Sequence, residues 1–446
     1  MKEKSSTPAW VAPALMSGYV LIILMPLAVV ALVRPLTDHG FVYTIGKNLG
    51  MVGFTILAMQ FVLSARLRWI ERPFGLNILF HFHKAMAVLA VVFLIAHPVL
   101  MCADHSDWSL IFGPEISWHI WLGRIALLIL VTHILLASLR SAIRLNYQTW
   151  RFVHNLGAVL ILPLGFFHSW MAGGDLQNLW IKALWIVLLV SAASMWLWHR
   201  VLRTALLRQA PYKVTEVLEE AEGVWSIVME PPPHSRRFDY LPGQFHFLTF
   251  QRAPHLPVEE HHWTISSSPS DEKVLCSTIK ESGDFTASIG KTKPGDTVLV
   301  HGPFGRFSYV LHPAERDLVF IAGGIGITPL MSMLRQIRDT RAGVKVTLLY
   351  CNQNERSIAF HKELDAMTAT EGLAIKVIHI LSKPSDDWPG ERGHLDGKMI
   401  QHLCGPNLKE KGFYVCAPPE MMNQTVKFLR KAGVPPARIH FERFQL

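Results

Sequence analysis

The chain has 446 residues and a formal net charge of +9, and 50% of its residues are hydrophobic while only 17% are charged. This length allows two to four domains, and the positive mean hydropathy predicts that part of the chain lies in a membrane. The five cysteines form no CxxC pair, so neither a thiolate metal knuckle nor a disulfide framework is indicated. Much of the positive charge flanks apolar segments, where it indicates membrane topology rather than nucleic-acid binding.

Six apolar segments have the length of a membrane-spanning helix, about 20 residues. They cover residues 11–33, 44–64, 82–103, 118–138, 152–171 and 180–199. No small-residue cleavage pattern follows the first segment, so we expect it to be retained rather than removed as a signal peptide. A six-helix transmembrane bundle over residues 1–208 follows.

Arginines predict the orientation of this bundle. They follow the second span, separate the fourth from the fifth and follow the sixth, whereas the loops at 104–117 and 172–179 have no Lys or Arg. Because basic loops stay in the cytoplasm, we expect both termini and everything after the sixth span to be cytoplasmic in a multi-pass cell-membrane protein.

Histidines inside apolar spans are costly to bury and usually functional. His83 and His97 are 14 residues apart in the third span, and His154 and His168 are 14 apart in the fifth. This spacing is nearly four helical turns, or about 21 Å, so each pair lies on one face of its helix. Opposed pairs would form two bis-histidine sites at two depths, a ligand set suited to haem that relays electrons.

Two alternatives remain open on spacing alone. Waters or carbonyl groups could satisfy these imidazoles without a metal. His119 and His133 in the fourth span are also 14 residues apart and lie at matching depths, so geometry inferred from the sequence does not choose between this pair and the others.

Short alternating strands follow the bundle, and their spacing predicts a small antiparallel β-barrel over residues 209–312. The expected strands are 213–219, 224–230, 244–250, 274–280 and 297–301. Residues 313–446 then alternate apolar strands with amphipathic helices, which predicts a Rossmann-like α/β domain with a parallel sheet. Its strands are expected at 318–322, 345–350, 374–380 and 412–416, with helices near 329, 357, 396 and 419. A ligand of such a sheet binds at the carboxyl ends of its strands.

A glycine-rich turn marks the nucleotide site. Gly323, Gly324 and Gly326 follow a strand and precede Thr328 and Pro329, expected as the N-cap and first residue of a helix. The glycines allow the backbone to approach a pyrophosphate, and the helix N-terminus provides free N–H groups. A purely structural strand-to-helix turn is the alternative.

A second cluster indicates a flat aromatic ligand such as the isoalloxazine of FAD. It comprises His261, Trp263, Thr264, Ile265, Ser266 and Ser267. The indole of Trp263 could stack on the ring while hydroxyl groups hydrogen-bond to it and His261 meets a phosphate. The residues from Gly283 to Thr286 could hold the FAD pyrophosphate with backbone N–H groups. The alternative for the first cluster is an ordinary buried strand.

Taken together, these motifs resemble the NADPH oxidase and ferric reductase superfamily, in which a six-span haem domain is joined to a ferredoxin-NADP reductase-like flavoprotein. Residues 261–264 are similar to its His-Pro-Phe-Thr signature, with His262 and Trp263 in place of Pro and Phe. Residues 323–329 are similar to its Gly-Gly-x-Gly-x-Thr-Pro signature, and 416–419 to its Cys-Gly-Pro-Pro signature, with Ala417 in place of Gly. The resemblance covers nearly the whole chain.

The resemblance also implies roles for individual residues. Cys416, followed by Pro418, would lie near the hydride path, and Phe444, two positions after Glu442, would cover the flavin until nicotinamide displaces it. The haem ligands of the superfamily come from the third and fifth spans, which favours His83, His97, His154 and His168 over His119 and His133. Arg356 could reach the 2′-phosphate of NADPH, although NADH is the alternative.

The implied protein, expected to be a prokaryotic member, carries electrons from NAD(P)H through FAD and two haem b groups to an acceptor on the outer face. Dioxygen, reduced to superoxide, is the preferred acceptor. A ferric chelate, gathered by Asp104, His105, Asp107 and Glu115, and an electron-accepting partner protein are the alternatives. The lipid bilayer is the other expected partner.

Overall fold

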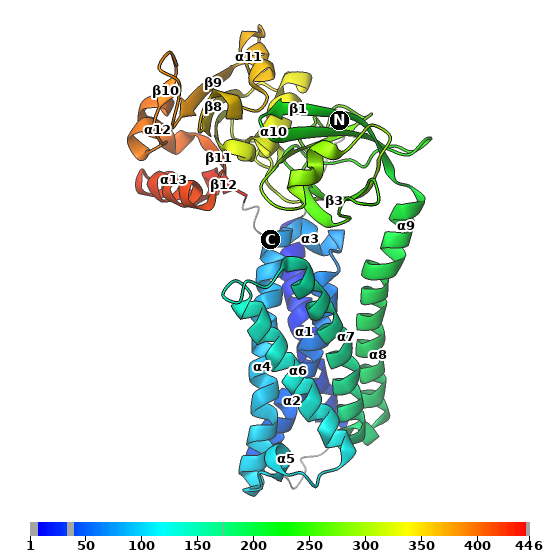
Figure 1. Ribbon diagram of the computed structural model, residues 1–446. Helices are drawn as coiled ribbons and strands as arrows, with labels where there is room; N and C mark the ends of the chain where they lie inside the picture. Colours follow the sequence, from blue (N-terminus) through cyan, green and yellow to red (C-terminus); the bar gives the residue numbers. More distant parts are fainter. Residues whose placement is uncertain (1–7, 34–39, 173, 443–446) are drawn as a thin grey trace. The chain divides into compact units, whose positions relative to one another are not determined.

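The computed structural model describes residues 8–33, 40–172 and 174–442, in two compact units that divide after Thr204. The first unit is helical and the second contains two β-sheets (Figure 1). The predicted order of six apolar helices, an antiparallel sheet and a parallel sheet is confirmed. The predicted boundaries at residues 208 and 312 stay predictions.

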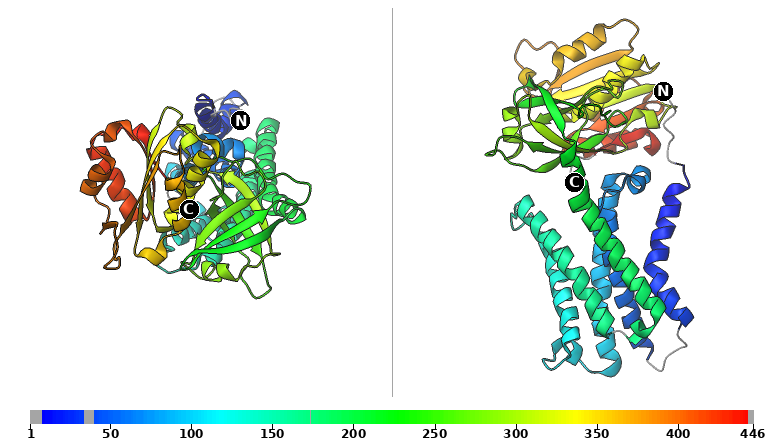
Figure 2. Two further views of the ribbon diagram at one scale, coloured as in Figure 1. Left: turned by 90° about the horizontal axis from the view of Figure 1, so that it is seen from above. Right: turned by 90° about the vertical axis from the view of Figure 1, so that its right-hand side faces the viewer.

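Six helices of the described chain are long and apolar enough to cross a membrane, and they run alongside one another (Figure 2, right). They are α1 (Val11–Val33), α2 (Phe41–Ser64), α4 (Leu76–His105), α6 (Trp118–Leu139), α7 (Tyr147–Ala172) and α8 (Leu179–Leu197). Each contains the span predicted for it or differs from it by one or two residues at an end, the usual uncertainty of a helix boundary.

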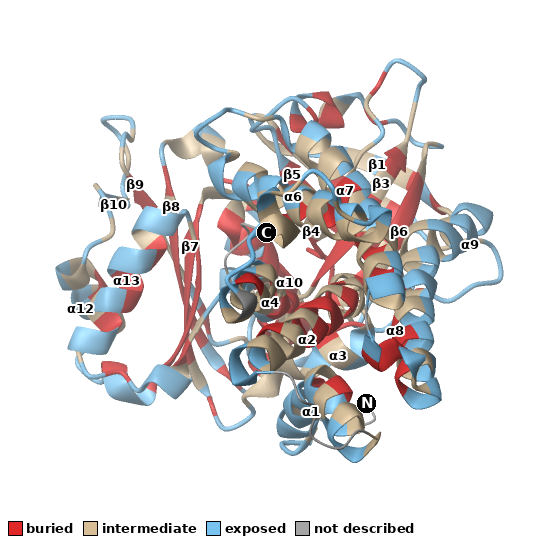
Figure 3. Ribbon diagram, turned by 90° about the horizontal axis from the view of Figure 1, so that it is seen from below, coloured by how far each residue is buried: buried red, intermediate tan, exposed pale blue. Residues whose placement is uncertain are grey.

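The helix α2 has the most buried residues of the six spans, as Figure 3 shows in red. Its Met51 and Phe54 pack with Trp185 of α8, while its Ile56 packs with Ala90 of α4. The other spans leave many large apolar side chains exposed, as expected of helices that face lipid. The central position of α2 makes it the wall against which α4 rests.

Short helices and turns connect the six spans and continue past the end of the first unit. They are α3 (Arg68–Phe74), α5 (Ser109–Phe112), the 3₁₀ turn η1 (Gly174–Gln177), the π-helical turn η2 (Trp198–Leu202) and α9 (Arg203–Gln209).

Six antiparallel strands in the order β4-β3-β6-β1-β2-β5 form the first sheet. Their bounds are β1 Tyr212–Ala221, β2 Val224–Glu230, β3 Phe245–Gln251, β4 Glu260–Thr264, β5 Leu275–Lys280 and β6 Thr297–Phe304. The edge strands β4 and β5 are not paired as a ladder, so the expected barrel is not closed. Just after β4, the N–H of Ser266 donates to the carbonyl of Cys276 in β5 at 2.8 Å, and the Ser267 hydroxyl accepts the N–H of Cys276 at 3.0 Å.

The second sheet is parallel, in the order β10-β9-β8-β7-β11-β12. Its strands are β7 Asp317–Gly323, β8 Lys345–Asn352, β9 Ile375–Leu381, β10 Glu391–Arg392, β11 Gly412–Cys416 and β12 Ile439–Phe441. The short β10 and β12 lie outside the prediction, because two or three residues show no periodicity. Helices α10 (Ile327–Thr340) and α11 (His361–Ala369) cover one face, and α12 (Gly397–Cys404) and α13 (Pro419–Lys431) cover the other (Figure 1).

Candidate redox and nucleotide sites

The structure brings His97 of α4 opposite His168 of α7. Their ring centroids lie 6.4 Å apart at an interplanar angle of 73°. The Nδ1 of His97 lies 2.9 Å from the carbonyl oxygen of Gly46, and the Nδ1 of His168 lies 2.8 Å from that of His119. Because a carbonyl can only accept, each Nδ1 carries the proton and donates it, which leaves each Nε2 with a free lone pair.

A second opposed pair lies on the same two helices, formed by His83 and His154 with ring centroids 6.3 Å apart. Their Nδ1 atoms are buried and have no hydrogen-bond partner. His133 of α6 stacks on His154 with a centroid distance of only 4.3 Å and a tilt of 30°. Stacked rings at this distance leave no room for a metal between them, so His133 does not face His154 across a metal site.

The two opposed pairs fit a six-coordinate metal held from both sides. Metal–nitrogen bonds of about 2.0–2.1 Å, with about 1.1 Å from nitrogen to ring centre, place opposed rings about 6.3 Å apart. Both measured separations match this value. His97 and His168 each donate a hydrogen bond from Nδ1 to a backbone carbonyl, and such hydrogen bonds commonly orient metal-binding imidazoles. The residues present therefore fit the two haem groups that the resemblance implies.

A cavity of about 940 Å³ adjoins the pair of His97 and His168. Its lining is mostly apolar, as in other cofactor sites. The charged side chains in its wall are Lys47, Asp107, Arg124 and Asp175. Lys47 Nζ lies 2.7 Å from Asp175 Oδ2, and the Asp175 side chain is buried.

Glycines on neighbouring helices make room for the imidazoles. A Cβ at Gly50 of α2 would lie 2.8 Å from the His97 ring, and one at Gly123 of α6 would lie 2.7 Å from the His168 ring. Sequence reasoning missed both glycines. The signal for the first was present, because Gly46 and Gly50 form a small-xxx-small pattern, which marks close helix packing in membranes.

In the second unit, the glycine-rich turn and the Cys416 segment meet at the carboxyl ends of two neighbouring strands of the parallel sheet. Strands β7 and β11 are neighbours with Cys416 in register with Ala322. A Cβ at Gly326 would collide with the carbonyl of Cys416, and a Cβ at Gly323 would lie 2.7 Å from Pro418 Cδ. The tight approach explains why glycine is needed at both positions, and Gly324 has φ +53°, which favours glycine.

The start of α10 differs from the prediction. The helix begins at Ile327, so Thr328 and Pro329 lie inside its first turn instead of at the N-cap and first position. Thr328 Oγ1 donates a hydrogen bond to the carbonyl of Ile325 at 3.1 Å. The 3₁₀ turn η5 (Gly324–Gly326) leads directly into the helix, which therefore starts two residues earlier in the chain than predicted.

Cys416 is buried, and burial together with the negative charge of Glu442 raises the pKa of its thiol well above the usual value. The backbone N–H of Glu442 donates to the carbonyl of Val415, which fastens this residue beside β11. Arg356 is exposed in the 3₁₀ turn η6 (Glu355–Ser357), just beyond the carboxyl end of β8. Phe444 lies outside the described residues.

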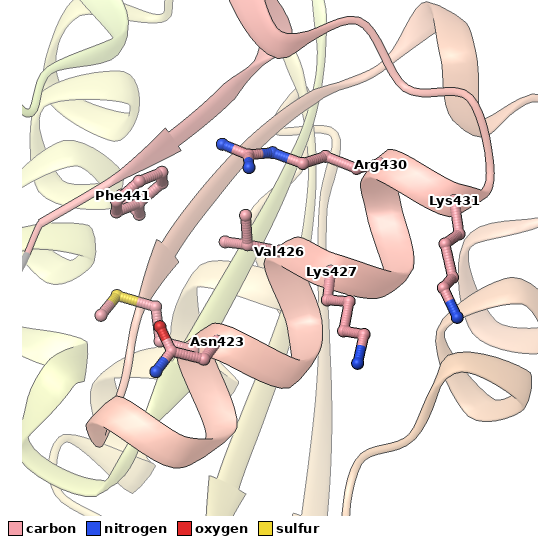
Figure 4. A pocket seen from close by; sticks show the side chains of 7 residues that line it. Asn423, Val426, Lys427, Arg430, Lys431 and Phe441 are labelled. Atoms are coloured by element: carbon pink, nitrogen blue, oxygen red, sulfur yellow. The ribbon is translucent and has the colours of Figure 1, made fainter.

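A groove of about 340 Å³ runs along α13 beside the end of β12. Lys427, Arg430 and Lys431 line it on the helix, and Phe441 contributes from the strand (Figure 4). The groove thus borders the last described strand before the predicted aromatic lid.

The predicted flavin segment begins in β4 and continues into a buried turn. The indole Nε1 of Trp263 is buried without a hydrogen-bond partner, so it can donate to a bound group. Thr264, Ile265, Ser266 and Ser267 are all buried. The hydroxyls of Ser266 and Ser267 contact Thr278 at 3.0 Å and Tyr240 at 2.9 Å, so both are engaged within the protein rather than offered to a ligand.

His261 and the loop at Gly283 lie together. The His261 ring is 4.4 Å from the Phe285 ring, and its Nε2 is 2.8 Å from Glu259 Oε2. Thr286 Oγ1 accepts the N–H groups of Ser282 at 2.8 Å and Gly283 at 2.9 Å. A pyrophosphate in this loop would take over these donors from Thr286.

Helix α10 holds the flavin segment against the parallel sheet, a connection that sequence reasoning missed. Arg335 donates to the carbonyl of Ser266 at 2.8 Å and to the carboxylate of Glu363 at 2.6 and 2.9 Å. Ser332 donates to the carbonyl of Ser267 at 2.7 Å. The helix that begins at the glycine-rich turn therefore also positions Thr264 and its neighbours.

Two families match the chain in the order of its two units. Residues 49–165 match the family described as "Ferric reductase like transmembrane component". Residues 320–427 match the "Oxidoreductase NAD-binding domain" family. By its architecture, the chain belongs to the NADPH oxidase and ferric reductase superfamily. It is thus an oxidoreductase with a multi-pass membrane domain, and its second unit is of the FAD- and NAD(P)H-binding type.

Individual relatives resemble the second unit. The chain is 33% identical over 211 residues to the glycine betaine monooxygenase reductase subunit of Pseudomonas aeruginosa, covering 46% of this chain and 57% of that one. It is 30% identical over 224 residues to the sulfhydrogenase 1 subunit gamma of Pyrococcus furiosus, covering 50% and 74%. A solved FAD/NAD-binding domain of nitric oxide dioxygenase from Vibrio cholerae is 26% identical, covers 52% of this chain and 97% of that domain, and has a TM-score of 0.47.

Proposed function

We propose that the chain carries electrons from cytosolic NAD(P)H across the membrane to dioxygen, with FAD and two haem b groups as carriers and superoxide as the product. The proposal rests on one observation: two opposed histidine pairs lie on the same two membrane helices. The pairs are His83 with His154 and His97 with His168. Bound FAD would supply hydride acceptance and single-electron release, and haem held by these histidines would supply one-electron transfer.

The chain's own residues bind, orient and enclose these groups. Gly46 and His119 hold their imidazole partners in the tautomer whose Nε2 can bind iron. Gly50 and Gly123 leave room for the rings. His83, His97, His154 and His168 would hold the haem iron through their imidazoles, and the haem would supply one-electron transfer there.

On the nucleotide side, the turn at 323–326 and the start of α10 would receive the pyrophosphate of NAD(P)H, and Arg356 would favour NADPH over NADH. The buried Cys416 stays a neutral thiol, since its pKa is raised. A neutral thiol beside the nicotinamide would exclude water without adding charge. Phe444 would act as the lid over the flavin.

Dioxygen is favoured over a ferric chelate by the contacts of Asp107, one of the four residues that were expected to gather cations. Asp107 accepts from the N–H and hydroxyl of Ser109, at 2.8 and 2.9 Å, so both of its carboxylate oxygens are already engaged at the start of α5. A neutral diatomic acceptor needs only access to the apolar cavity beside His97 and His168.

Reduction of the purified, haem- and FAD-loaded chain by NADPH tests the proposal. We expect haem bands that reduce anaerobically and reoxidise in air, with a reporter signal that superoxide dismutase abolishes. Haem that stays reduced in air until ferric chelate or a partner protein is added would assign the acceptor to the alternatives. Absence of two haems per chain would reject the relay itself.

A further inference from the structure

His379, in the middle of β9, is a half-buried polar residue that the proposed electron path does not use. Both of its ring nitrogens are buried and have no hydrogen-bond partner. A neutral imidazole has one donor and one acceptor, and leaving either unsatisfied in the interior costs about 1–3 kcal/mol. An ordered water or a metal ion is the usual explanation for such a group.

Two further metal-binding side chains lie beside it on α11. His361 and Asp365 are separated by one helical turn and therefore share one face of the helix. His361 Nε2 is 3.8 Å from Asp365 Oδ2, and the rings of His361 and His379 have centroids 5.0 Å apart at 78°. One ligand atom from each of the three residues lies within 4.8 Å of the others.

This arrangement meets the requirements of a small metal ion. Ligands bonded at about 2.0–2.2 Å to a tetrahedral ion are separated by about 3.4 Å, so rotations of the exposed His361 and Asp365 side chains suffice to close the site. Two imidazoles with one carboxylate suit zinc and related transition metals rather than calcium or magnesium. His361 and Asp365 are 43% and 64% exposed, so the ion can enter from solvent.

We propose that His361, Asp365 and His379 bind one divalent transition-metal ion of the zinc class, separate from the haem ligands, that fastens α11 to β9. The fourth position would be taken by water, since no further metal-binding group of the described residues belongs to this cluster. The ion would satisfy one of the ring nitrogens of His379 left without a partner.

A second cluster in this unit provides the comparison. His312, Glu315 and His440 also lie within 4.8 Å of one another. There, however, Glu315 already accepts from His440 at 2.9 Å and from Tyr414 at 2.8 Å. An ion would have to break these bonds, so we expect this cluster to remain a hydrogen-bonded network.

Zinc binding by the full-length holoprotein tests the proposal, with any affinity tag removed because tag histidines bind the same ion. The protein in detergent is dialysed against buffered ZnCl₂, and the bound zinc is measured per chain by elemental analysis. We expect one tightly bound zinc in the wild type and an at least tenfold weaker affinity in His361→Ala and Asp365→Asn. Both side chains are exposed, so the fold should tolerate these changes.

His402→Ala, an exposed histidine of α12, and His312→Ala, from the second cluster, are the matched controls. Both should keep the zinc, and zinc should raise the thermal unfolding temperature of the wild type and of the controls but not of His361→Ala. Failure of the wild type to bind zinc, retention by His361→Ala and Asp365→Asn, or loss in His312→Ala would each overturn the assignment.

Discussion

Single atoms decide whether an imidazole can bind a metal in this chain. At His97, a carbonyl fixes the proton on Nδ1, and Gly50 leaves the space in which the ring lies. A side chain at Gly50 would have to occupy the volume of that ring, because even a Cβ would approach it to 2.8 Å.

We therefore expect Gly50→Val to displace His97 and to lower the haem content from two to about one per chain, with FAD retained. Gly18→Val is the matched control, since nothing lies within 4 Å of a Cβ at that position of α1. Haem is measured as its pyridine complex and FAD by fluorescence after release. Two haems in the Gly50 variant would exclude this role of the glycine.

A different histidine, His246 of β3, is fully buried, and its Nε2 lies 2.6 Å from Ser277 Oγ. Burial lowers the pKa of His246 to about 3, against 6.5 when exposed. Below pH 6.5, His246 therefore binds a proton in the unfolded chain but stays neutral in the folded chain. The free energy of unfolding consequently falls as the pH drops from 6.5 toward 3. The slope is about 1.4 kcal/mol per pH unit for this group.

We expect His246→Asn to reduce that slope, even though loss of the bond to Ser277 lowers stability at every pH. Urea unfolding at pH 7.5, 6.5 and 5.5, followed by FAD release, compares variant and wild type. Equal slopes in the two proteins would show that His246 does not titrate as inferred.

At the scale of elements, α10 joins the two sheets of the second unit through Arg335, which bonds to Ser266 and Glu363. We expect Arg335→Met to destabilise the flavin segment by about 1.5–3 kcal/mol, the usual contribution of a charged hydrogen bond. FAD should dissociate at a lower temperature and with a higher Kd. Lys427→Met, on the exposed face of α13, should leave both values unchanged.

The elements also show what the sequence could predict. Hydropathy located all six spans, and glycine chemistry located the turn between β7 and α10. Periodicity does not reveal which face of one helix meets which neighbour, so spacing alone left His133 open, and only the family resemblance favoured His154. The structure shows the His154 ring 6.3 Å from His83 and the His133 ring stacked on His154. The same holds for Arg335 and Ser266, which are 69 positions apart in the chain.

For the whole molecule, the two units have separate hydrophobic cores. We expect a fragment of residues 205–446 to be soluble, to bind FAD and to transfer electrons from NAD(P)H to ferricyanide. Reduction of haem should require the complete chain. A fragment that aggregates or fails to bind FAD would show that the second unit depends on the first.

The close approach of Gly50 to His97, and of Gly123 to His168, has an evolutionary consequence. Each glycine and its histidine form a pair in which a larger residue at the first position is compatible only with a smaller side chain at the second. The two positions should therefore change together among homologues, so that a lineage that abandons an imidazole becomes free to fill the space beside it.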